Sequence, residues 1–221
     1  LVGLKGKKHW YITDDSNYTH HITTADIDGD GDLDVLTAED SSPNRLYLND
    51  GDGSLSAGID ITADADGTIG ITTADIDGDG DLDVLVGNDG QNRLYLNNGD
   101  GSFAAGTNIS ADAHYTSKLM TADIDSDGDL DVIAVNTLDT VNRLYRNDGN
   151  GNFNAGENIT ADAHSTFGLT TADIDGDGDL DVLVGNINGA KNRLYLNDGT
   201  GNFAAGEDIT ADTHSTYSLA V

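Results

Sequence analysis

The chain has 221 residues, and its 40 aspartates and glutamates outnumber its 10 lysines and arginines, which gives a formal net charge of −30. Such an excess of acid repels phosphate, so the composition argues against nucleic acid as a partner and favours cations. The absence of cysteine excludes disulfides and thiolate metal sites. No apolar run approaches the roughly 18 residues that span a bilayer, so we expect no membrane insertion.

The sequence is a tandem array of four units. The phrase TADIDGDGDLDV begins at Thr24, Thr73 and Thr171, and a fourth copy beginning at Thr121 differs only at Ser126. A second phrase, NRLY, follows each copy and begins at positions 44, 92, 142 and 192. Units of this length cannot each bury a core of their own, so neighbouring units must pack on one another.

Residues 1–15 precede the first full unit. The segment HWYI at 9–12 stands where a preceding unit would have its fourth strand, and LVGL at 1–4 stands where it would have its third. This region has no initiator Met and no signal-like apolar core. If the protein is secreted, we therefore expect that a targeting segment has already been removed.

Each unit predicts four short antiparallel strands. In the unit at 163–212, the small and β-branched run Phe167–Ile174 predicts the first strand, and the apolar run Val182–Val184, after the acidic loop, predicts the second. NRLYLND at 192–198 predicts the third strand. Asp198 and Gly199 then give a tight-turn signal into a fourth strand that ends near Ile209.

Four such strands in about 40 to 50 residues are typical of a propeller blade, whereas a calcium-bound β-helix repeats about every nine residues. The predicted fold is all-β, a β-propeller of four-stranded antiparallel blades, with four complete blades plus partial blade strands at both termini. As one repeat domain, the chain divides into partial strands at 1–15, blades at 16–63, 64–112, 113–162 and 163–212, and the first strand of a further blade at 213–221.

The aspartate loops have the residue spacing of a calcium site. In the loop that begins at Asp26, carboxylates fall at positions 1, 3, 5, 7 and 9, and Gly31 at position 6 permits a sharp turn. Position 12, where an EF-hand carries its closing glutamate, holds Thr37, so the loop must close through position 9. We predict about four calcium ions, one per blade, bound by Asp26, Asp28, Asp30, Asp32, Asp34, Asp75, Asp77, Asp79, Asp81, Asp83, Asp123, Asp125, Asp127, Asp129, Asp131, Asp173, Asp175, Asp177, Asp179 and Asp181.

Two alternatives to calcium are a solvated acidic turn without an ion and a magnesium site. Carboxylates this close repel one another by about 1 kcal/mol per pair at 4 Å even in water, and the fourfold repetition makes chance untenable. Magnesium prefers rigid octahedral sites and retains water. Within each loop we expect positions 1, 3, 5 and 9 to bind through side chains. We expect position 7 to offer a backbone carbonyl and to point its carboxylate to solvent; these residues are Asp32, Asp81, Asp129 and Asp179.

The phrase ADIDGDGDLDVLVGN, followed by NRLYLNDGTGNF, resembles the FG-GAP-like (VCBS-type) repeat, the blade of calcium-binding propellers related to the integrin α-subunit head. The resemblance covers residues 16–214. It implies a calcium ion in the loop between the first two strands of each blade, and extracellular adhesion, carbohydrate-binding or scaffold roles. The chain departs from the family in having one FG pair, at Phe167 and Gly168, no GAP tripeptide and four blades instead of the usual seven. Integrin-like ligand recognition is therefore not expected.

The third strand of each unit carries an arginine and a tyrosine. We expect the tyrosines to pack between blades, with stacking on sugar rings as the alternative. We expect the arginines to pair with neighbouring acidic loops. The tyrosines are Tyr47, Tyr95, Tyr145 and Tyr195, and the arginines are Arg45, Arg93, Arg143 and Arg193.

Three N-glycosylation sequons occur, at Asn17, Asn108 and Asn158. The pattern is a weak signal in a sequence rich in asparagine. The last two nevertheless fall at equivalent positions in their units, so they are candidate modification sites.

The sequence predicts a secreted or cell-surface calcium-binding propeller that acts as a structural or adhesive module. A lectin that binds carbohydrate is the alternative. An enzyme is not expected, because there is no nucleophile motif, no phosphate loop and no unpaired acid that stands apart from the metal loops. The incomplete terminal blades predict self-association by head-to-tail strand exchange, the geometry of a filament, unless the chain is a segment of a longer array.

Overall fold

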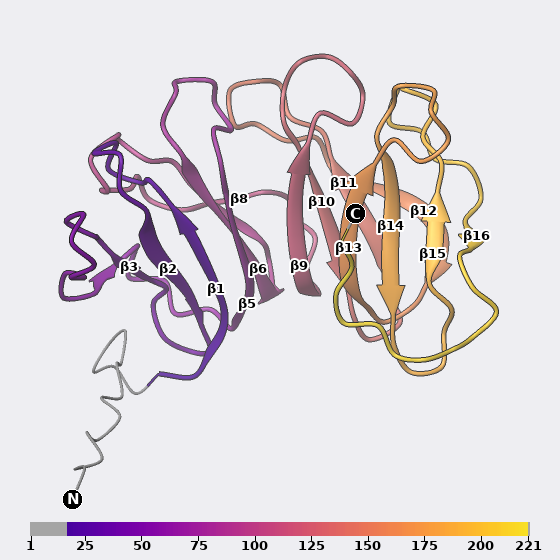
Figure 1. The fold of residues 1–221 in the computed structure, drawn as a ribbon, viewed down its shortest axis with the longest axis horizontal. Coiled ribbons are helices and arrows are strands. Elements are labelled where there is room, and N and C mark those ends of the chain that lie inside the picture. Colours follow the sequence, from indigo (N-terminus) through magenta and orange to yellow (C-terminus); the bar gives the residue numbers. More distant parts are fainter. Residues whose placement is uncertain (1–16, 221) are drawn as a thin grey trace, which may run out of the picture.

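The computed structural model describes residues 17–220, and every regular element in them is a β-strand (Figure 1). Among these residues there is no helix that could cross a lipid bilayer. Unit 1 consists of β1 (Thr19–Ala25), β2 (Asp34–Glu39), β3 (Arg45–Tyr47) and β4 (Ile59–Asp60). Unit 2 consists of β5 (Thr68–Ala74), β6 (Asp83–Gly90), β7 (Arg93–Tyr95) and β8 (Thr107–Asn108). Unit 3 consists of β9 (His114–Ala122), β10 (Asp131–Asn136), β11 (Val141–Tyr145) and β12 (Glu157–Ala163). Unit 4 consists of β13 (Thr166–Ala172), β14 (Asp181–Asn186), β15 (Arg193–Tyr195) and β16 (Glu207–Asp208).

Within each unit, consecutive strands pair antiparallel in sequence order. The predicted all-β fold of four-stranded antiparallel units is thus confirmed. Units 2 and 3 are joined into one sheet because the end of β6 also pairs with the start of β9, at Asp89 with Tyr115 and at Gly90 with His114.

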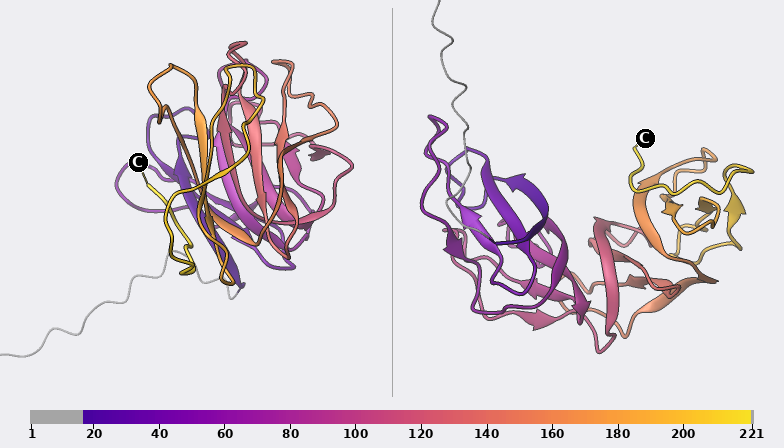
Figure 2. Two further views of the ribbon diagram at one scale, coloured as in Figure 1. Left: turned by 90° about the vertical axis from the view of Figure 1, so that its right-hand side faces the viewer. Right: turned by 90° about the horizontal axis from the view of Figure 1, so that it is seen from below.

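The four units stand side by side in a curved row, and the row stays open between unit 1 and unit 4 (Figure 2). The four predicted units are therefore present, but a full propeller of four blades is not confirmed, because these residues form an open row. The first strands β1, β5, β9 and β13 are neighbours along the row. The partial strands predicted in 1–15 lie outside the described residues. Residues 213–220 form no regular strand, but the Thr216 N–H donates to the Asn186 carbonyl at 2.9 Å, so this segment runs beside β14.

The hydrophobic cores lie between units and not within them. Each core combines one face of a unit with the opposite face of the next unit, and the third-strand tyrosine belongs to the second of these faces. Between units 3 and 4 the core residues are Ala122, Ile124, Ile133, Val135, Leu144 and Ile159 on one side, and Leu169, Val182, Val184 and Tyr195 on the other. The prediction that the tyrosines pack between units is confirmed for Tyr95, Tyr145 and Tyr195, which belong to these cores. Tyr47 of unit 1 is equally buried but belongs to none of them.

The third-strand arginines are not placed as predicted. Arg93 pairs with Asp64 at 2.8 Å, in the segment that leads from unit 1 into unit 2, and the Tyr95 hydroxyl donates to the same carboxylate at 3.2 Å. Arg143 and Arg193 repeat the arrangement in units 3 and 4. The reason is register: Arg93 lies opposite Val86, toward the end of β6, whereas the aspartate loop precedes the start of that strand.

In units 2, 3 and 4, an asparagine after the third strand connects the unit to the preceding one. Its side-chain amide donates to the carbonyl of the isoleucine at position 2 of the preceding aspartate loop. The three buried bonds are Asn97 to Ile27 at 2.8 Å, Asn147 to Ile76 at 2.7 Å and Asn197 to Ile124 at 2.7 Å. Each aspartate loop from unit 1 to unit 3 is therefore held by the unit that follows it.

Replacing Asn97 with Ala will destabilise the fold by about 1–3 kcal/mol more than replacing Asn49 with Ala, because only Asn97 satisfies a buried carbonyl of another unit. The two residues are otherwise matched. Each accepts from a turn glycine and donates to a leucine carbonyl within its own unit, at distances that agree within 0.1 Å. Urea unfolding of both variants gives the difference, and equal losses would contradict a role between units.

Candidate metal centres

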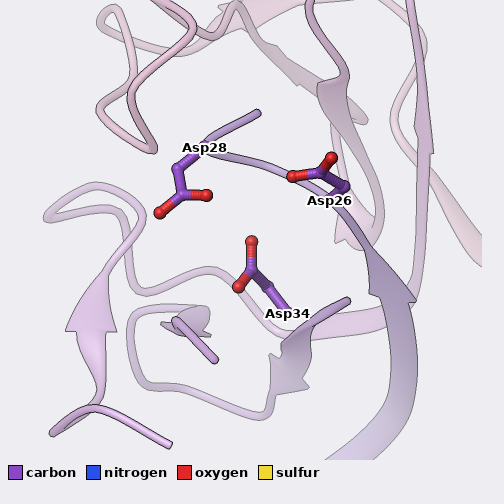
Figure 3. A group of neighbouring side chains, drawn as sticks. All are labelled: Asp26, Asp28 and Asp34. Carbon is purple, nitrogen blue, oxygen red and sulfur yellow. The ribbon is translucent and has the colours of Figure 1, made fainter. Parts of the chain in front are cut away.

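Each aspartate loop joins the first and second strands of its unit and brings three carboxylates together. In units 1, 2 and 4 these are positions 1, 3 and 9, with one oxygen from each within 4.8 Å of the others. In unit 3 the cluster is Asp123, Asp125 and Asp127, at positions 1, 3 and 5. Figure 3 shows Asp26, Asp28 and Asp34 of unit 1 with their carboxylates directed toward a common centre.

The donor set fits a hard divalent cation. All the side-chain ligands are carboxylate oxygens, and two oxygens on opposite sides of a calcium ion lie about 4.6–5.2 Å apart, which accommodates the observed separations. The Asp26 Oδ1 atom is buried and accepts no hydrogen bond. A buried carboxylate oxygen without a donor is unfavourable unless a cation supplies the missing charge. Each loop could therefore hold a metal ion.

The aspartate at position 9 also has a structural role. Asp83 is buried and accepts two backbone hydrogen bonds at 2.9 Å, from the Ile76 N–H to Oδ2 and from the Asn97 N–H to Oδ1. The equivalent aspartates Asp34, Asp131 and Asp181 make the same pair of bonds. Position 9 thus joins the aspartate loop to the turn that follows the third strand.

The carboxylates at position 7 do not point to solvent as predicted. Asp32 is half-buried against Gly51, so closely that a methyl group on that glycine would collide with the carboxylate. Asp81, Asp129 and Asp179 lie in the same way against Gly99, Gly149 and Gly199. The turn after the third strand is held over the loop by the position-9 aspartate, and this leaves the position-7 side chain between the two turns.

Position 5 lies at the exposed edge of each loop. In loop 1 the Asp30 Oδ1 atom accepts the Asp32 N–H at 2.9 Å, and Asp79, Asp127 and Asp177 do the same. Of the twenty predicted ligands, the structure therefore brings three side chains per loop together, and position 5 belongs to the cluster in loop 3 alone.

Burial and mutual repulsion raise the pKa of several loop carboxylates. Burial, followed by the charges of neighbouring loop aspartates, raises the pKa of Asp28 and Asp77 at position 3. At position 9, burial raises the pKa of Asp83 and of Asp131 to about 6, against the two backbone hydrogen bonds that lower it. Without a cation, these carboxylates therefore ionise at higher pH than ordinary aspartates do.

Calcium will raise the melting temperature more at about pH 7.5 than at about pH 5. In the metal-free chain, the raised pKa of Asp83 and Asp131 means that the folded state binds more protons than the unfolded state between about pH 4 and 6, so stability falls as pH rises through that window. Calcium bound at these loops would replace those protons, so its effect is expected to be largest where the carboxylates are ionised. Melting curves with calcium and with EDTA at both pH values test this, and equal shifts would contradict it.

The three sequon asparagines, Asn17, Asn108 and Asn158, are all exposed. The side chains of Asn108 and Asn158 accept hydrogen bonds from Arg93 and Arg143, respectively. Glycosylation at these positions stays a prediction.

Sequence reasoning missed the contribution of the turn that follows the third strand. Its asparagine, Asn49 or an equivalent, donates a backbone N–H to the position-9 aspartate, and its first glycine borders position 7. The signal was present, because the phrase Asn-Asp-Gly or Asn-Asn-Gly recurs with every aspartate loop.

Comparison with solved structures shows the same fold in several proteins. A lectin from Agrocybe aegerita, described for its specific recognition of non-reducing terminal N-acetylglucosamine, matches with a TM-score of 0.62 at 22% identity, over 86% of this chain and 52% of the lectin. The biofilm matrix protein Bap1 of V. cholerae matches with a TM-score of 0.55 at 19% identity, over 85% of this chain and 28% of Bap1. BBS1N, in complex with ARL6DN, matches with a TM-score of 0.56 at 12% identity, over 91% of this chain and 60% of BBS1N. The chain thus spans between about a quarter and three fifths of these proteins.

A search of curated proteins found no match. The family model for the FG-GAP-like repeat matches four times, at residues 26–86, 75–134, 123–184 and 175–221. Each match begins in or directly at an aspartate loop, and together they include all four candidate metal centres. The chain therefore belongs to the FG-GAP-like repeat family.

Proposed function

We propose that the protein is a calcium-stabilised, non-catalytic structural or adhesive module of the extracellular space. The observation that carries the proposal is the carboxylate cluster that recurs in the aspartate loop of all four units. Calcium fits it better than magnesium because calcium accepts six to eight oxygen ligands in flexible geometry, whereas magnesium demands a near-ideal octahedron and retains water. The fold shared with a biofilm matrix protein supports a matrix role.

The two end faces of the row support assembly with further units. Ile174 and Ile209 of unit 4 are 44% and 42% exposed, whereas their equivalents Ile124 and Ile159 in unit 3 are 1% and 5% exposed beneath unit 4. At the other end, Ile22 of unit 1 is 50% exposed. Unit 4 therefore exposes the face that in unit 3 packs against a following unit. Unit 1 exposes the opposite face, the one that in units 2 to 4 packs against a preceding unit. Head-to-tail contact between copies would complete a repeating interface, the geometry of a filament or a ring.

Sedimentation velocity over a range of protein concentrations, with calcium present, tests this assembly. The average mass is expected to rise with concentration for the native chain, whereas Ile174→Asp is expected to remain monomeric because a charge enters the face of unit 4. Leu138→Asp is the control, since Leu138 is 74% exposed and lies outside both end faces. A native chain that stays monomeric throughout would contradict the proposal.

Carbohydrate binding is a second candidate, favoured by one cavity and by the fold shared with a lectin. The third-strand tyrosines are buried and cannot stack on sugars. A cavity of about 370 Å³ lies instead along the first strands, lined by His20, Lys118, Phe167 and Tyr217 among others. The rings of Phe167 and Tyr217 meet edge to face, 5.5 Å apart, and such aromatic surfaces suit the apolar faces of sugar rings.

A glycan array probed at saturating calcium tests this candidate. Binding that is lost in Phe167→Ala and Tyr217→Ala, and kept in Leu138→Ala, would support a lectin role for the cavity. The absence of binding to any glycan, or binding that is insensitive to both aromatic changes, would count against it.

A further inference from the structure

The third aspartate loop differs from the other three by having an arginine beside it. Position 146 is an arginine, whereas the equivalent residue after the other third strands is Leu48, Leu96 or Leu196. Leu48 and Leu96 pack against a glycine of the following unit, next to the position-3 aspartate of their own loop. Arg146 occupies the same place and brings a positive charge to it.

The Arg146 guanidinium contacts a candidate metal ligand directly. Its Nη1 atom lies 2.9 Å from Asp125 Oδ2 and 2.7 Å from the Thr200 carbonyl oxygen of unit 4, and its Nη2 atom lies 3.4 Å from Glu157 Oε2. Both members of the Arg146–Asp125 pair are mostly buried, with side chains 23% and 14% exposed. A shielded pair of this kind is screened by solvent much less than a surface pair.

An arginine guanidinium is charged at every physiological pH. Arg146 therefore places a permanent positive charge in contact with Asp125.

The backbone hydrogen bonds of the third loop also differ from those of the other loops. In loops 1, 2 and 4 the position-5 N–H approaches the position-3 carboxylate at 3.2–3.3 Å. In loop 3 the Asp127 N–H donates instead to Asp123 Oδ1 at 3.1 Å. Ser126 replaces the glycine at position 4, with φ of 61°. The cluster of loop 3 also substitutes position 5 for position 9.

We propose that Arg146 supplies at loop 3 part of the charge that a metal ion supplies at the other loops, so that loop 3 binds calcium at least about tenfold more weakly than they do. The inference rests on the proposed calcium binding. A divalent ion at this loop must share Asp125 with the guanidinium, and the positive charge of the guanidinium repels the ion. The loop keeps a weaker site because Asp125 Oδ1 is buried and has no hydrogen-bond partner. The chain would thus have three tight sites and one that fills only at higher calcium.

Isothermal calorimetric titration of the full chain with calcium tests the proposal. The native chain is expected to show three tight sites and a fourth at least about tenfold weaker, and Arg146→Leu is expected to show four comparable sites. If Arg146→Leu does not fold, Arg146→Gln removes the charge while keeping a long polar side chain, and gives the same expectation. Leu96→Arg is the matched converse. It places an arginine beside Asp77 and is expected to leave only two tight sites.

Each other outcome overturns a different statement. The role of Arg146 would be overturned if the native chain had four equal sites. It would also be overturned if neither the Arg146 variants nor Leu96→Arg changed the number of tight sites. Calcium binding itself would stand in both cases. The role of Arg146 would also be overturned if Asp125→Asn removed one of the three tight sites, because Asp125 belongs to the weak site. A chain that binds no calcium at all would overturn both the proposed function and this inference.

Discussion

Chelation of calcium with EDTA will unfold the protein or lower its melting temperature by far more than any single substitution does. The chain has a formal net charge of −30, and each unit concentrates three carboxylates within 4.8 Å. A bound ion removes that repulsion and, at a hundredfold excess over its dissociation constant, contributes about 2.7 kcal/mol per site. With several sites filled, the total is comparable to the whole stability of an ordinary domain, about 5–15 kcal/mol.

Circular dichroism melting curves with calcium, with magnesium and with EDTA measure this effect. Sodium chloride at high concentration is the control, because it screens exposed charges without occupying the sites. If the salt restores the calcium melting temperature in EDTA, the role of calcium is general charge screening. A melting temperature that is the same with calcium and with EDTA would contradict calcium-dependent folding.

Asp83→Ala will destabilise the protein by about 2–6 kcal/mol even without calcium, because it leaves the buried N–H groups of Ile76 and Asn97 without an acceptor. The substitution cuts the link between the aspartate loop and the turn after the third strand, and it also removes a ligand of the candidate metal centre. The loss measured with calcium is therefore expected to exceed the loss measured in EDTA.

Asp81→Ala is the matched control for Asp83→Ala. It removes a carboxylate two residues away that lies outside the cluster, so we expect a much smaller loss of both stability and calcium affinity. Denaturant unfolding of both variants, measured with calcium and in EDTA, separates the loss of the hydrogen bonds from the loss of the metal ligand. If the metal-free chain is unfolded at neutral pH, the EDTA measurement is made at low pH. Equal losses for the two variants would show that position 9 has no special role.

The sequence predicted the elements that depend on local pattern. The alternation of apolar residues and the turn signals predicted four antiparallel strands per unit. The loop spacing predicted that positions 1, 3, 5 and 9 converge, and in loop 1 Asp26, Asp28 and Asp34 do so whereas Asp30 does not. Tyr95, Tyr145 and Tyr195 lie between units as predicted, because a repeat without its own core must bury its large side chains against a neighbour.

The features that the sequence did not predict depend on contacts between distant segments. Asp32 is half-buried because Gly51 folds over it, and nothing in the spacing of a loop indicates which turn will cover it. The open row depends on the angle between neighbouring units, which a repeat pattern does not specify. The sequence shows Arg146 where the other three units have leucine. Its contact with Asp125 could not be predicted, because the sequence does not show that the end of the third strand lies beside the aspartate loop.

Because each hydrophobic core is shared by two neighbours, no unit of this protein is a domain in its own right. An internal unit that unfolds exposes two cores at once, whereas an end unit exposes only one, so loss of structure should begin at the ends and proceed inward. The same arrangement makes the array modular in evolution. Since the same apolar positions recur on the facing surfaces of successive units, duplication or deletion of a whole unit would require only small adjustments of side-chain size at the new interface.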